Sequence, residues 1–375
     1  MKEQFDQLFN NKRRNLAKNY NSQKRKYKWV NKLVKLLFWI LFFGLSIEYK
    51  LYEILSGINN KELIIVLYLF LFLSLYSLLT WIIEYLLIYR LNRKYQLSNQ
   101  DTRSWWLDKI KHFFLNLIFL YLSARLILYL IKVYPDNWWI YFSFTGIIFY
   151  TVITFLLPYV ILPLFYKLEK YPENSLRKRL MNFIKKIDLK VDDIYQIDLS
   201  SKVNFANAAV IGLGKSRKII LGDNLKDKYT DDEIEAVLAH ELGHHVHKDI
   251  IKNLIINGAG LFFTAFIISK LWYNLITYIE YTAIEIYSLP LLLVVWSLLF
   301  LLISPLELYL SRRFEENADN FALNNIENPE NLGKGLAKLA DESLSEIEYN
   351  LYELLFEASH PSIGKRVEKS LEWKN

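Results

Sequence analysis

Long apolar segments constrain this chain more than any other feature of its sequence. A helix needs roughly 20 apolar residues to cross the hydrocarbon core of a bilayer. The 375-residue chain has six segments of about that length, near residues 33–51, 63–89, 113–132, 139–165, 252–273 and 284–310. With 53% hydrophobic residues and a mean hydropathy of +0.12, it is also too apolar for an ordinary soluble enzyme. The sequence therefore predicts a mainly α-helical, multi-pass integral membrane protein whose partner is the lipid bilayer.

The distribution of basic residues predicts the orientation in the membrane. The net charge of +7 comes from lysines and arginines that gather beside apolar segments, which favours a membrane surface over nucleic acid as the partner. The arm 1–32 and the loop 90–112 are basic, whereas the other short loops are poor in Lys and Arg. The positive-inside rule then puts both termini and region 166–251 in the cytoplasm. This pattern does not distinguish a bacterial inner membrane from an ER-type membrane.

Residues His240-Glu241-Leu242-Gly243-His244 read H-E-x-x-H inside a stretch with helical character. Positions i and i+4 share one helix face, so both imidazoles can reach one metal ion. Glu241 lies beside His240 around the helix, where it can take a proton from a metal-bound water without ligating the metal. We expect Gly243 to leave room beside the metal. The alternative is a chance match on a charged helix.

The ligands of such a site must be His, Asp or Glu, because the chain has no cysteine. The same absence excludes disulfides and cysteine nucleophiles. A catalytic zinc takes three protein ligands and one open position, and Glu315 is the candidate for the third, just past the sixth apolar segment. Asp319 shares its helix face and can hydrogen-bond a ligand histidine from behind. Glu316 points about 100° away and is the poorer candidate. The alternative is a solvated, charged helix end.

The polar stretches divide the chain into five predicted parts. These are a basic cytoplasmic arm (1–32), membrane helices one to four (33–166), a first catalytic part with the zinc helix (167–251), membrane helices five and six (252–310) and a second catalytic part (311–375). In the first catalytic part we expect a helix over 174–187 and strands at Ile194–Asp198, Ala208–Gly212 and Lys218–Leu221, the last two joined by a turn over 212–217. An edge strand of this small sheet can bind an extended peptide through its backbone. A purely structural hairpin is the alternative.

The chain resembles the type I CAAX prenyl endopeptidases, integral-membrane H-E-x-x-H zinc metalloproteases related to the HtpX-type proteases. The resemblance runs from about residue 65 to 370 and rests on the zinc helix with Asn207–Ala208, Gly222–Leu225, Arg312–Asp319 and His360–Pro361 in the family's order. It implies that the transmembrane helices, about six by the apolar segments and so fewer than the seven of the best-known eukaryotic members, surround a water-filled chamber. A cytoplasmic zincin-like catalytic domain that carries a small β-sheet would cap it. Glu84, Asn116 and Arg125, inside apolar segments, would then face the chamber.

The resemblance also implies a role for individual residues. The zinc ligands correspond to His240, His244 and Glu315, the general base to Glu241, and the carboxylate behind a ligand to Asp319. The substrate-binding residues correspond to Asn207 and Ala208 of the edge strand and to Arg366, a basic residue near the site. A further active-site histidine corresponds to His360. We expect His360 to help stabilise the oxyanion. His245, where the prenyl proteases usually have tryptophan, leaves the substrate preference open, and we expect it to lie at the surface or behind the ligands.

The predicted function is that of a zinc-dependent membrane metalloendopeptidase. Its partner is a peptide or protein substrate, and by resemblance to CAAX prenyl protease type 1 it would cleave near prenylated C-termini. Nothing in the sequence itself indicates prenylation, and a broad-specificity membrane quality-control protease would share every catalytic residue. A non-enzymatic transporter would call for inverted repeats and paired broken helices, and the sequence has neither.

Overall fold

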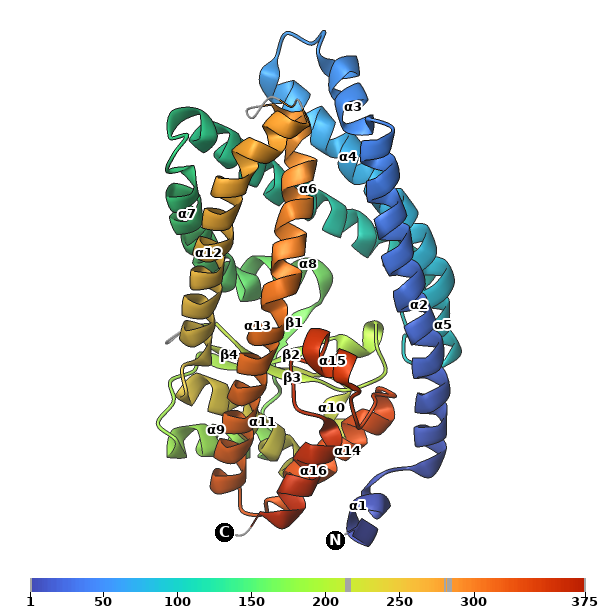
Figure 1. Ribbon diagram of the computed structural model, residues 1–375. Coiled ribbons are helices and arrows are strands. Elements are labelled where there is room, and N and C mark those ends of the chain that lie inside the picture. The colour runs from blue at the N-terminus through green and yellow to red at the C-terminus, as the bar shows by residue number, and fades with distance from the viewer. Residues whose placement is uncertain (1, 213–216, 280, 282–284, 374–375) are drawn as a thin grey trace.

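The computed structural model describes residues 2–212, 217–279, 281 and 285–373. Long helices form one end of the molecule, while the sheet and the shorter helices form the other, where both ends of the chain lie (Figure 1). The described α-helices are α1 (Lys2–Leu8), α2 (Asn11–Gly44), α3 (Ile47–Leu55), α4 (Lys61–Ile83), α5 (Arg90–Lys94), α6 (Thr102–Val133), α7 (Trp138–Leu156), α8 (Leu162–Phe165), α9 (Ser175–Lys186), α10 (Leu225–Lys228), α11 (Asp231–Val246), α12 (Asp249–Tyr278), α13 (Leu289–Asn325), α14 (Glu330–Glu342), α15 (Leu351–Phe356) and α16 (Ile363–Glu372).

The long helices confirm a mainly α membrane fold with about six spans. Among the described residues, the stretches long and apolar enough to cross a bilayer are Lys61–Lys94, Thr102–Val133, Trp138–Phe165, Asp249–Tyr278 and Ile286–Asn325. A sixth span results if α2 and α3, bent by 58° relative to each other, count as one. The sequence predicts a boundary at residue 33 between a basic arm and a first span. In the structure, α2 begins at Asn11 and continues across that boundary. Charge indicates where a helix becomes polar and not where it ends.

Two spans are interrupted by π-helical stretches. The first, η1 (Glu84–Tyr89), joins α4 to α5, and the second, η2 (Leu157–Ile161), joins α7 to α8. Pro158 lies at the start of η2, where its missing N–H leaves the ordinary helical ladder incomplete. Both stretches line one cavity of about 930 Å³ between the membrane helices and the sheet. Glu84 faces this cavity as the sequence predicts, whereas Arg125 pairs with Glu62 where α4 begins.

The small sheet has four strands in the order β1-β2-β4-β3. They are β1 (Leu168–Lys170), β2 (Asp193–Ile197), β3 (Ala208–Ile211) and β4 (Lys218–Gly222). β2 and β4 are parallel, and the other two pairs are antiparallel. The three predicted strands are present within about a residue, and β3 is an edge strand. The short, charged β1 has no apolar alternation that could predict it, and the predicted turn falls on 213–216, outside the described residues.

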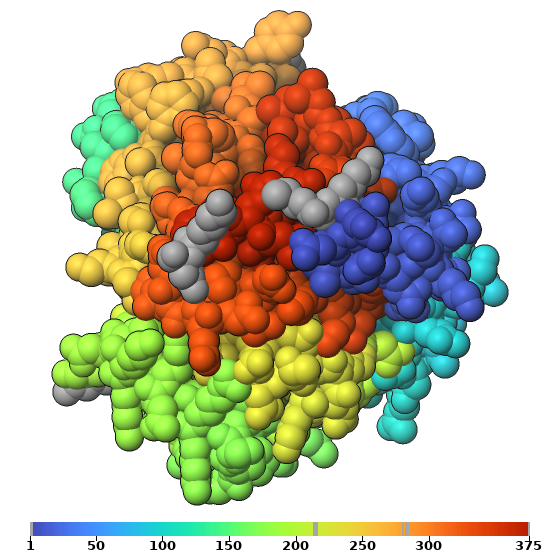
Figure 2. All heavy atoms as spheres, turned by 90° about the horizontal axis from the view of Figure 1, so that it is seen from below, coloured from blue at the N-terminus to red at the C-terminus, as the bar shows by residue number. Residues whose placement is uncertain are grey.

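One hydrophobic core joins the two catalytic parts, although two membrane helices separate them in sequence. Leu180 of α9, Ile219 of β4, Leu242 of α11 and Ala337 of α14 are all fully buried in it. Seen from below, the C-terminal segments lie between the N-terminal helix and the yellow-green 167–251 region (Figure 2). The site at this end is therefore assembled from distant parts of the chain.

Candidate metal centre

Helix α11 carries the H-E-x-x-H motif and begins at a capping box. Thr230 accepts a hydrogen bond from the Glu233 N–H (3.3 Å), and the Glu233 carboxylate accepts one from the Thr230 N–H (2.8 Å). These two bonds satisfy N–H groups that the first turn of a helix leaves free. The cap fixes where the helix starts. His240 and His244 then lie one turn apart, with ring centroids separated by 4.9 Å.

Gly243 lets helix α13 approach α11 closely. A Cβ at this position would lie 2.9 Å from the Ala318 Cα and 3.1 Å from the Ala318 carbonyl oxygen, which is too close. The expectation that Gly243 leaves room beside the metal is therefore wrong, because the room is filled by the backbone of α13. The close approach of the two helices still helps to form the site, because it brings Glu315 of α13 to the two histidines.

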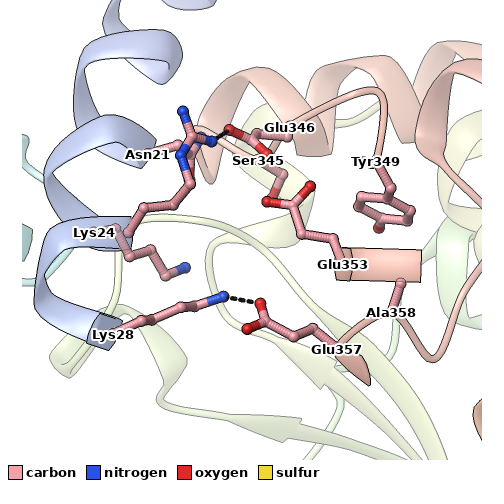
Figure 3. A pocket seen from close by; sticks show the side chains of 10 residues that line it. Asn21, Lys24, Lys28, Ser345, Glu346, Tyr349, Glu353, Glu357 and Ala358 are labelled. Atoms are coloured by element: carbon pink, nitrogen blue, oxygen red, sulfur yellow. Dashed lines mark hydrogen bonds and ion pairs between the residues drawn. The ribbon is translucent and has the colours of Figure 1, made fainter. Parts of the chain in front are cut away.

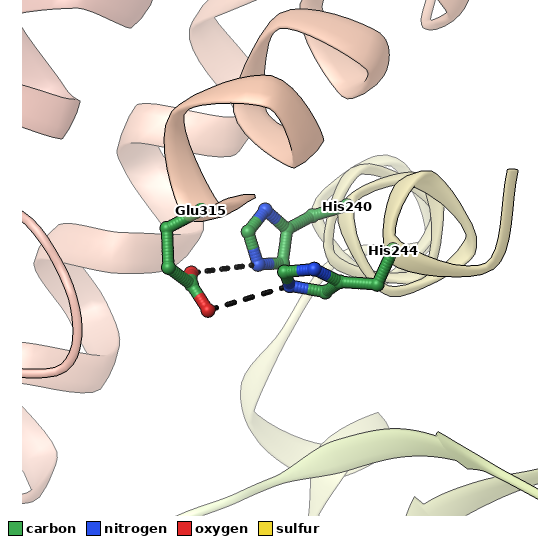
Figure 4. A group of neighbouring side chains, drawn as sticks. All are labelled: His240, His244 and Glu315. Atoms are coloured by element: carbon green, nitrogen blue, oxygen red, sulfur yellow. Dashed lines mark ion pairs between the residues drawn. The ribbon is translucent and has the colours of Figure 1, made fainter. Parts of the chain in front are cut away.

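His240, His244 and Glu315 form a cluster that can hold a metal ion. Each offers one ligand atom, and these atoms all lie within 4.8 Å of one another (Figure 4). His240 Nε2 is 3.3 Å from Glu315 Oε2, and His244 Nε2 is 3.4 Å from Glu315 Oε1. Glu315 Oε2 is buried and has no hydrogen-bond partner in the described part of the chain. Two imidazole nitrogens and one carboxylate oxygen fit a metal that keeps one position open for catalysis.

A carboxylate lies behind each histidine. His240 Nδ1 is 2.9 Å from Asp319 Oδ1, as the sequence suggests, and His244 Nδ1 is 3.0 Å from Asp249 Oδ2. Such contacts fix the ring orientation and leave the other nitrogen free for a metal. Asp249 is absent from the sequence-based site. In the sequence, the only indication of its role is that an acidic residue occurs five positions after His244, where α12 begins.

Arg366 is buried behind the metal cluster. Its Nε and Nη2 atoms donate hydrogen bonds to the two oxygens of Asp319, at 2.9 and 2.7 Å. Its Nη2 atom also lies 3.9 Å from Glu315 Oε2. The resemblance assigns Arg366 to substrate binding, and a substrate contact stays a prediction. The hydrogen bonds in this structure give it a role in positioning Asp319.

His245 connects the metal helix to the edge strand β3. Its Nε2 donates a hydrogen bond to the Val210 carbonyl (3.0 Å), and its Nδ1 accepts one from the Arg217 Nε–H (3.1 Å). A carbonyl can only accept and a guanidinium only donate, so these partners define a neutral tautomer. Burial lowers the pKa of His245, which favours the same form. His245 is buried and belongs to neither the surface nor the ligand set.

The remaining predicted residues meet in a cavity of about 270 Å³ beside the metal cluster. The predicted residues on its wall are Asn207, Ala208, His240, Glu241, His360 and Arg366. Part of its apolar wall is Leu332, Leu336 and Leu339 of α14. Burial raises the pKa of the Glu241 carboxyl. His360 Nε2 lies 3.2 Å from Glu315 Oε1. The cavity therefore brings the start of β3 together with Glu241, His360 and one residue of the metal cluster, His240.

Two family models match the chain, one on each half. Residues 170–374 match peptidase family M48, and residues 1–167 match the CAAX prenyl protease N-terminal family, described as five membrane helices. The crystal structure of S. mikatae Ste24p has the same fold, with a TM-score of 0.83 at 22% identity over 97% of this chain and 89% of that one.

Curated relatives agree with these models. An uncharacterized metalloprotease, YhfN of Bacillus subtilis, is 28% identical over 76% of this chain and 68% of its own length. A probable CAAX prenyl protease 1 of Schizosaccharomyces pombe is 28% identical over 78% of this chain and 60% of its own length. The chain therefore belongs to peptidase family M48, as a membrane-embedded metalloprotease similar to the CAAX prenyl proteases.

Proposed function

We propose that the chain is a zinc-dependent endopeptidase whose ligands are His240, His244 and Glu315. The observation that carries the proposal is the cluster of two histidines and one carboxylate, each histidine backed by a second carboxylate. Zinc prefers this combination of nitrogen and oxygen donors. When bound, it would lower the pKa of a water molecule and polarise the scissile carbonyl.

Glu241 serves as the general base in this proposal. Its carboxylate takes the proton from the attacking water and later gives it to the leaving amine. Burial raises the pKa of its carboxyl, because a buried carboxylate loses the solvation that favours its charged form. His360, whose Nε2 lies beside Glu315, would donate a hydrogen bond to the developing oxyanion. Arg366 would keep Asp319, and through it His240, in place.

The edge strand β3 would hold the substrate in an extended conformation. The Val210 carbonyl already bonds His245, so the start of β3, near Asn207 and Ala208, is the part available to a peptide backbone. Neutral His245 thus fixes the distance between the strand and the metal helix. The peptide would cross the metal cluster beside Glu241.

Prenylated proteins are the substrates that we propose. The curated relatives named CAAX prenyl protease support this class. An apolar cavity of about 290 Å³ among α4, α6, α7, α12 and α13 supports it further, since an isoprenoid chain needs an apolar environment. The catalytic part would lie in the cytoplasm, on the side where the basic arm and the basic loop 90–112 lie.

Peptide hydrolysis by the purified protein in detergent tests the proposal. We expect a farnesylated C-terminal peptide to be cleaved, with the activity lost on chelation and restored by Zn²⁺. Cleavage unaffected by the chelator would contradict the metal mechanism. Equal cleavage of the same peptide without its farnesyl group, and of unfolded membrane protein, would instead favour a broad-specificity protease.

A further inference from the structure

A cavity of about 390 Å³ among the membrane helices α7, α12 and α13 has polar side chains on its wall. Two of them are Asn257 of α12 and Glu307 of α13. Leu261 and Trp296 line this cavity and also the apolar cavity of about 290 Å³ among α4, α6, α7, α12 and α13. The two cavities are therefore neighbours on the inner side of the membrane helices.

Glycines close the seam between α7 and α12 beside this cavity. A Cβ at Gly146 would lie 2.7 Å from Leu261 Cδ2, and one at Gly258 would lie 2.9 Å from Ile147 Cδ1. Contacts this short require that the two helices pack closely, with no room for a larger residue at either glycine. The polar side chains of the cavity are thus separated from the lipid on the α7–α12 side.

Glu307 is a carboxylate without a partner in this cavity. Two other carboxylates of the membrane spans have basic partners, since Glu62 pairs with Arg125 and Glu84 with Lys109. Glu307 is partly buried, yet it has neither an ion pair nor a hydrogen bond with any residue that the structure describes. A charged side chain inside a membrane span is costly and usually marks a functional site. A cation beside Glu307 would compensate its charge.

The most highly charged pocket outside the active site differs from this cavity. It has a volume of about 190 Å³, lies between α2 and residues 345–358, and has three basic and three acidic side chains on its wall. Arg25 pairs there with Glu346, and Lys28 with Glu357 (Figure 3). Because its charges compensate one another, this pocket favours neither a cation nor an anion.

The surroundings of Glu307 suit a cation with an apolar stem. Its Oε1 atom reaches the surface of α12, where a Cβ at Gly260 would lie 3.6 Å from it. Asn257 lies three positions before Gly260 and so on the same face of α12. Trp296 and Phe300, one turn apart on α13, add aromatic rings that attract cations. One carboxylate and one amide are too few for Ca²⁺ or Mg²⁺, whereas a lysine or arginine side chain matches all of these groups.

Both helices place this cavity at the same distance from the metal cluster. Asn257 follows Asp249 by eight positions on α12, and Glu307 precedes Glu315 by eight on α13. The two helices run side by side from the catalytic end into the membrane part (Figure 1). Eight helical residues rise about 12 Å. An extended peptide covers that distance with about four residues.

We propose that the cavity is a substrate subsite for a lysine or arginine side chain, with Glu307 as its partner. The inference rests on the proposed peptidase function and adds a specificity-determining residue to it. The basic side chain lies within about four residues of the scissile bond, the number of extended residues that span the distance from the metal cluster. Asn257 accepts a second hydrogen bond from the cation through its amide oxygen. The apolar cavity next to it remains available to the isoprenoid chain.

Farnesylated peptides that differ at one position test this subsite. Each has lysine, methionine or glutamate at one position within four residues of the scissile bond, and mass spectrometry of the products identifies the bond that is cleaved. At one of these positions we expect wild-type protein to prefer lysine to methionine by roughly 10-fold or more in kcat/KM, the range of a hydrogen bond to a charged group. Glutamate at that position should be the poorest of the three.

Variants of Glu307 assign the preference to this residue. Glu307→Gln should lose the preference for lysine while it cleaves the methionine peptide at the wild-type rate. Glu307→Lys reverses the charge and should prefer glutamate at the same position, which a merely structural role would not produce. The matched control is Glu316→Gln, because Glu316 lies on the same helix in an exposed pair with Arg313, and it should keep the preference for lysine.

The affinities of the same peptides for Glu241→Gln protein separate this inference from the peptidase proposal. A preference for lysine in binding that is lost on addition of Glu307→Gln supports the subsite even if wild-type protein cleaves no peptide. Cleavage without a preference for lysine at any of the positions would overturn the subsite and leave the peptidase proposal standing. So would a Glu307→Gln variant that lowers cleavage of the lysine and methionine peptides equally, or a Glu316→Gln variant that also loses the preference.

Discussion

The metal cluster and the Arg125–Glu62 pair place charges in opposite environments. The side chains of His240 and Glu315 are 8% and 9% exposed, whereas those of Arg125 and Glu62 are 42% and 49% exposed. A buried charge is costly unless its partners are complete, so few arrangements are tolerated. An exposed pair contributes about 0–1 kcal/mol and tolerates change. From this comparison we expect the importance of an ion pair in this protein to depend on its burial and not on its length.

Removal of both ligand histidines should have the largest effect. His240→Ala combined with His244→Ala leaves Glu315 alone, so zinc should fall from about one per chain to none, with loss of all peptidase activity. Elemental analysis and peptide cleavage measure both quantities. The control is Glu316→Gln, which alters the exposed neighbour that pairs with Arg313 and should keep metal and activity. Full zinc retention in the double variant would sink the ligand assignment.

Loss of the proposed general base, Glu241, should have the second-largest effect on activity. Glu241→Gln preserves the shape of the side chain and removes its ability to take a proton, so turnover should fall by roughly 10²–10⁴-fold. Zinc content should stay at the wild-type level because Glu241 is not a ligand. Glu235→Gln, on the same helix in an ion pair with Arg179, is the control and should remain active. Normal turnover in Glu241→Gln protein would mean that the water is activated in another way.

Removal of the Asp249 carboxylate, which lies behind His244, should have a smaller effect on metal affinity. Asp249→Asn keeps a side chain of the same size but weakens the contact that orients the ring, and such changes typically cost about 10- to 100-fold in metal affinity. Competition with a chelator of known affinity measures the loss. Because Asp249 also accepts a hydrogen bond from Lys252, Lys252→Met separates the two contacts and should leave affinity near the wild-type value. An unchanged affinity in Asp249→Asn would break the comparison between buried and exposed pairs.

Disruption of the exposed Arg125–Glu62 pair should have the smallest effect on the protein. Arg125→Met removes the contact with Glu62, and the free energy of unfolding should change by less than about 1 kcal/mol. Thermal unfolding in detergent, with metal content and activity as further readouts, measures this. A large loss of stability there would show that exposure is a poor guide to the importance of a charge in this protein.

Local spacing predicted the histidine pair of the metal cluster, because one turn of a helix determines that His240 and His244 share a face. Two histidines four positions apart and a carboxylate just past the last apolar segment define it almost completely. Asp249 and the link from His245 to Val210 depend on how α11 meets α12 and the sheet, which the spacing does not describe.

Hydropathy located the membrane spans but not their irregularities. It cannot detect the bend between α2 and α3, since Ser46 adopts a left-handed conformation with φ of 50° that no apolar pattern signals. It also misses η1 and η2, where the average apolar character is unchanged. These features determine which side chains reach a cavity, so the sequence predicted the fold class more completely than it predicted the cavity walls.

The division of the ligands between α11 and α13 has a consequence for the time at which the enzyme becomes active. His240 and His244 are synthesised before α12, and Glu315 follows the membrane part of α13. On the proposed ligand set, a growing chain that has just completed the H-E-x-x-H motif has two ligands and no third. Only after both intervening helices have entered the bilayer and turned back can Glu315 reach the histidines. We therefore expect the nascent protein to lack peptidase activity until its own insertion is complete.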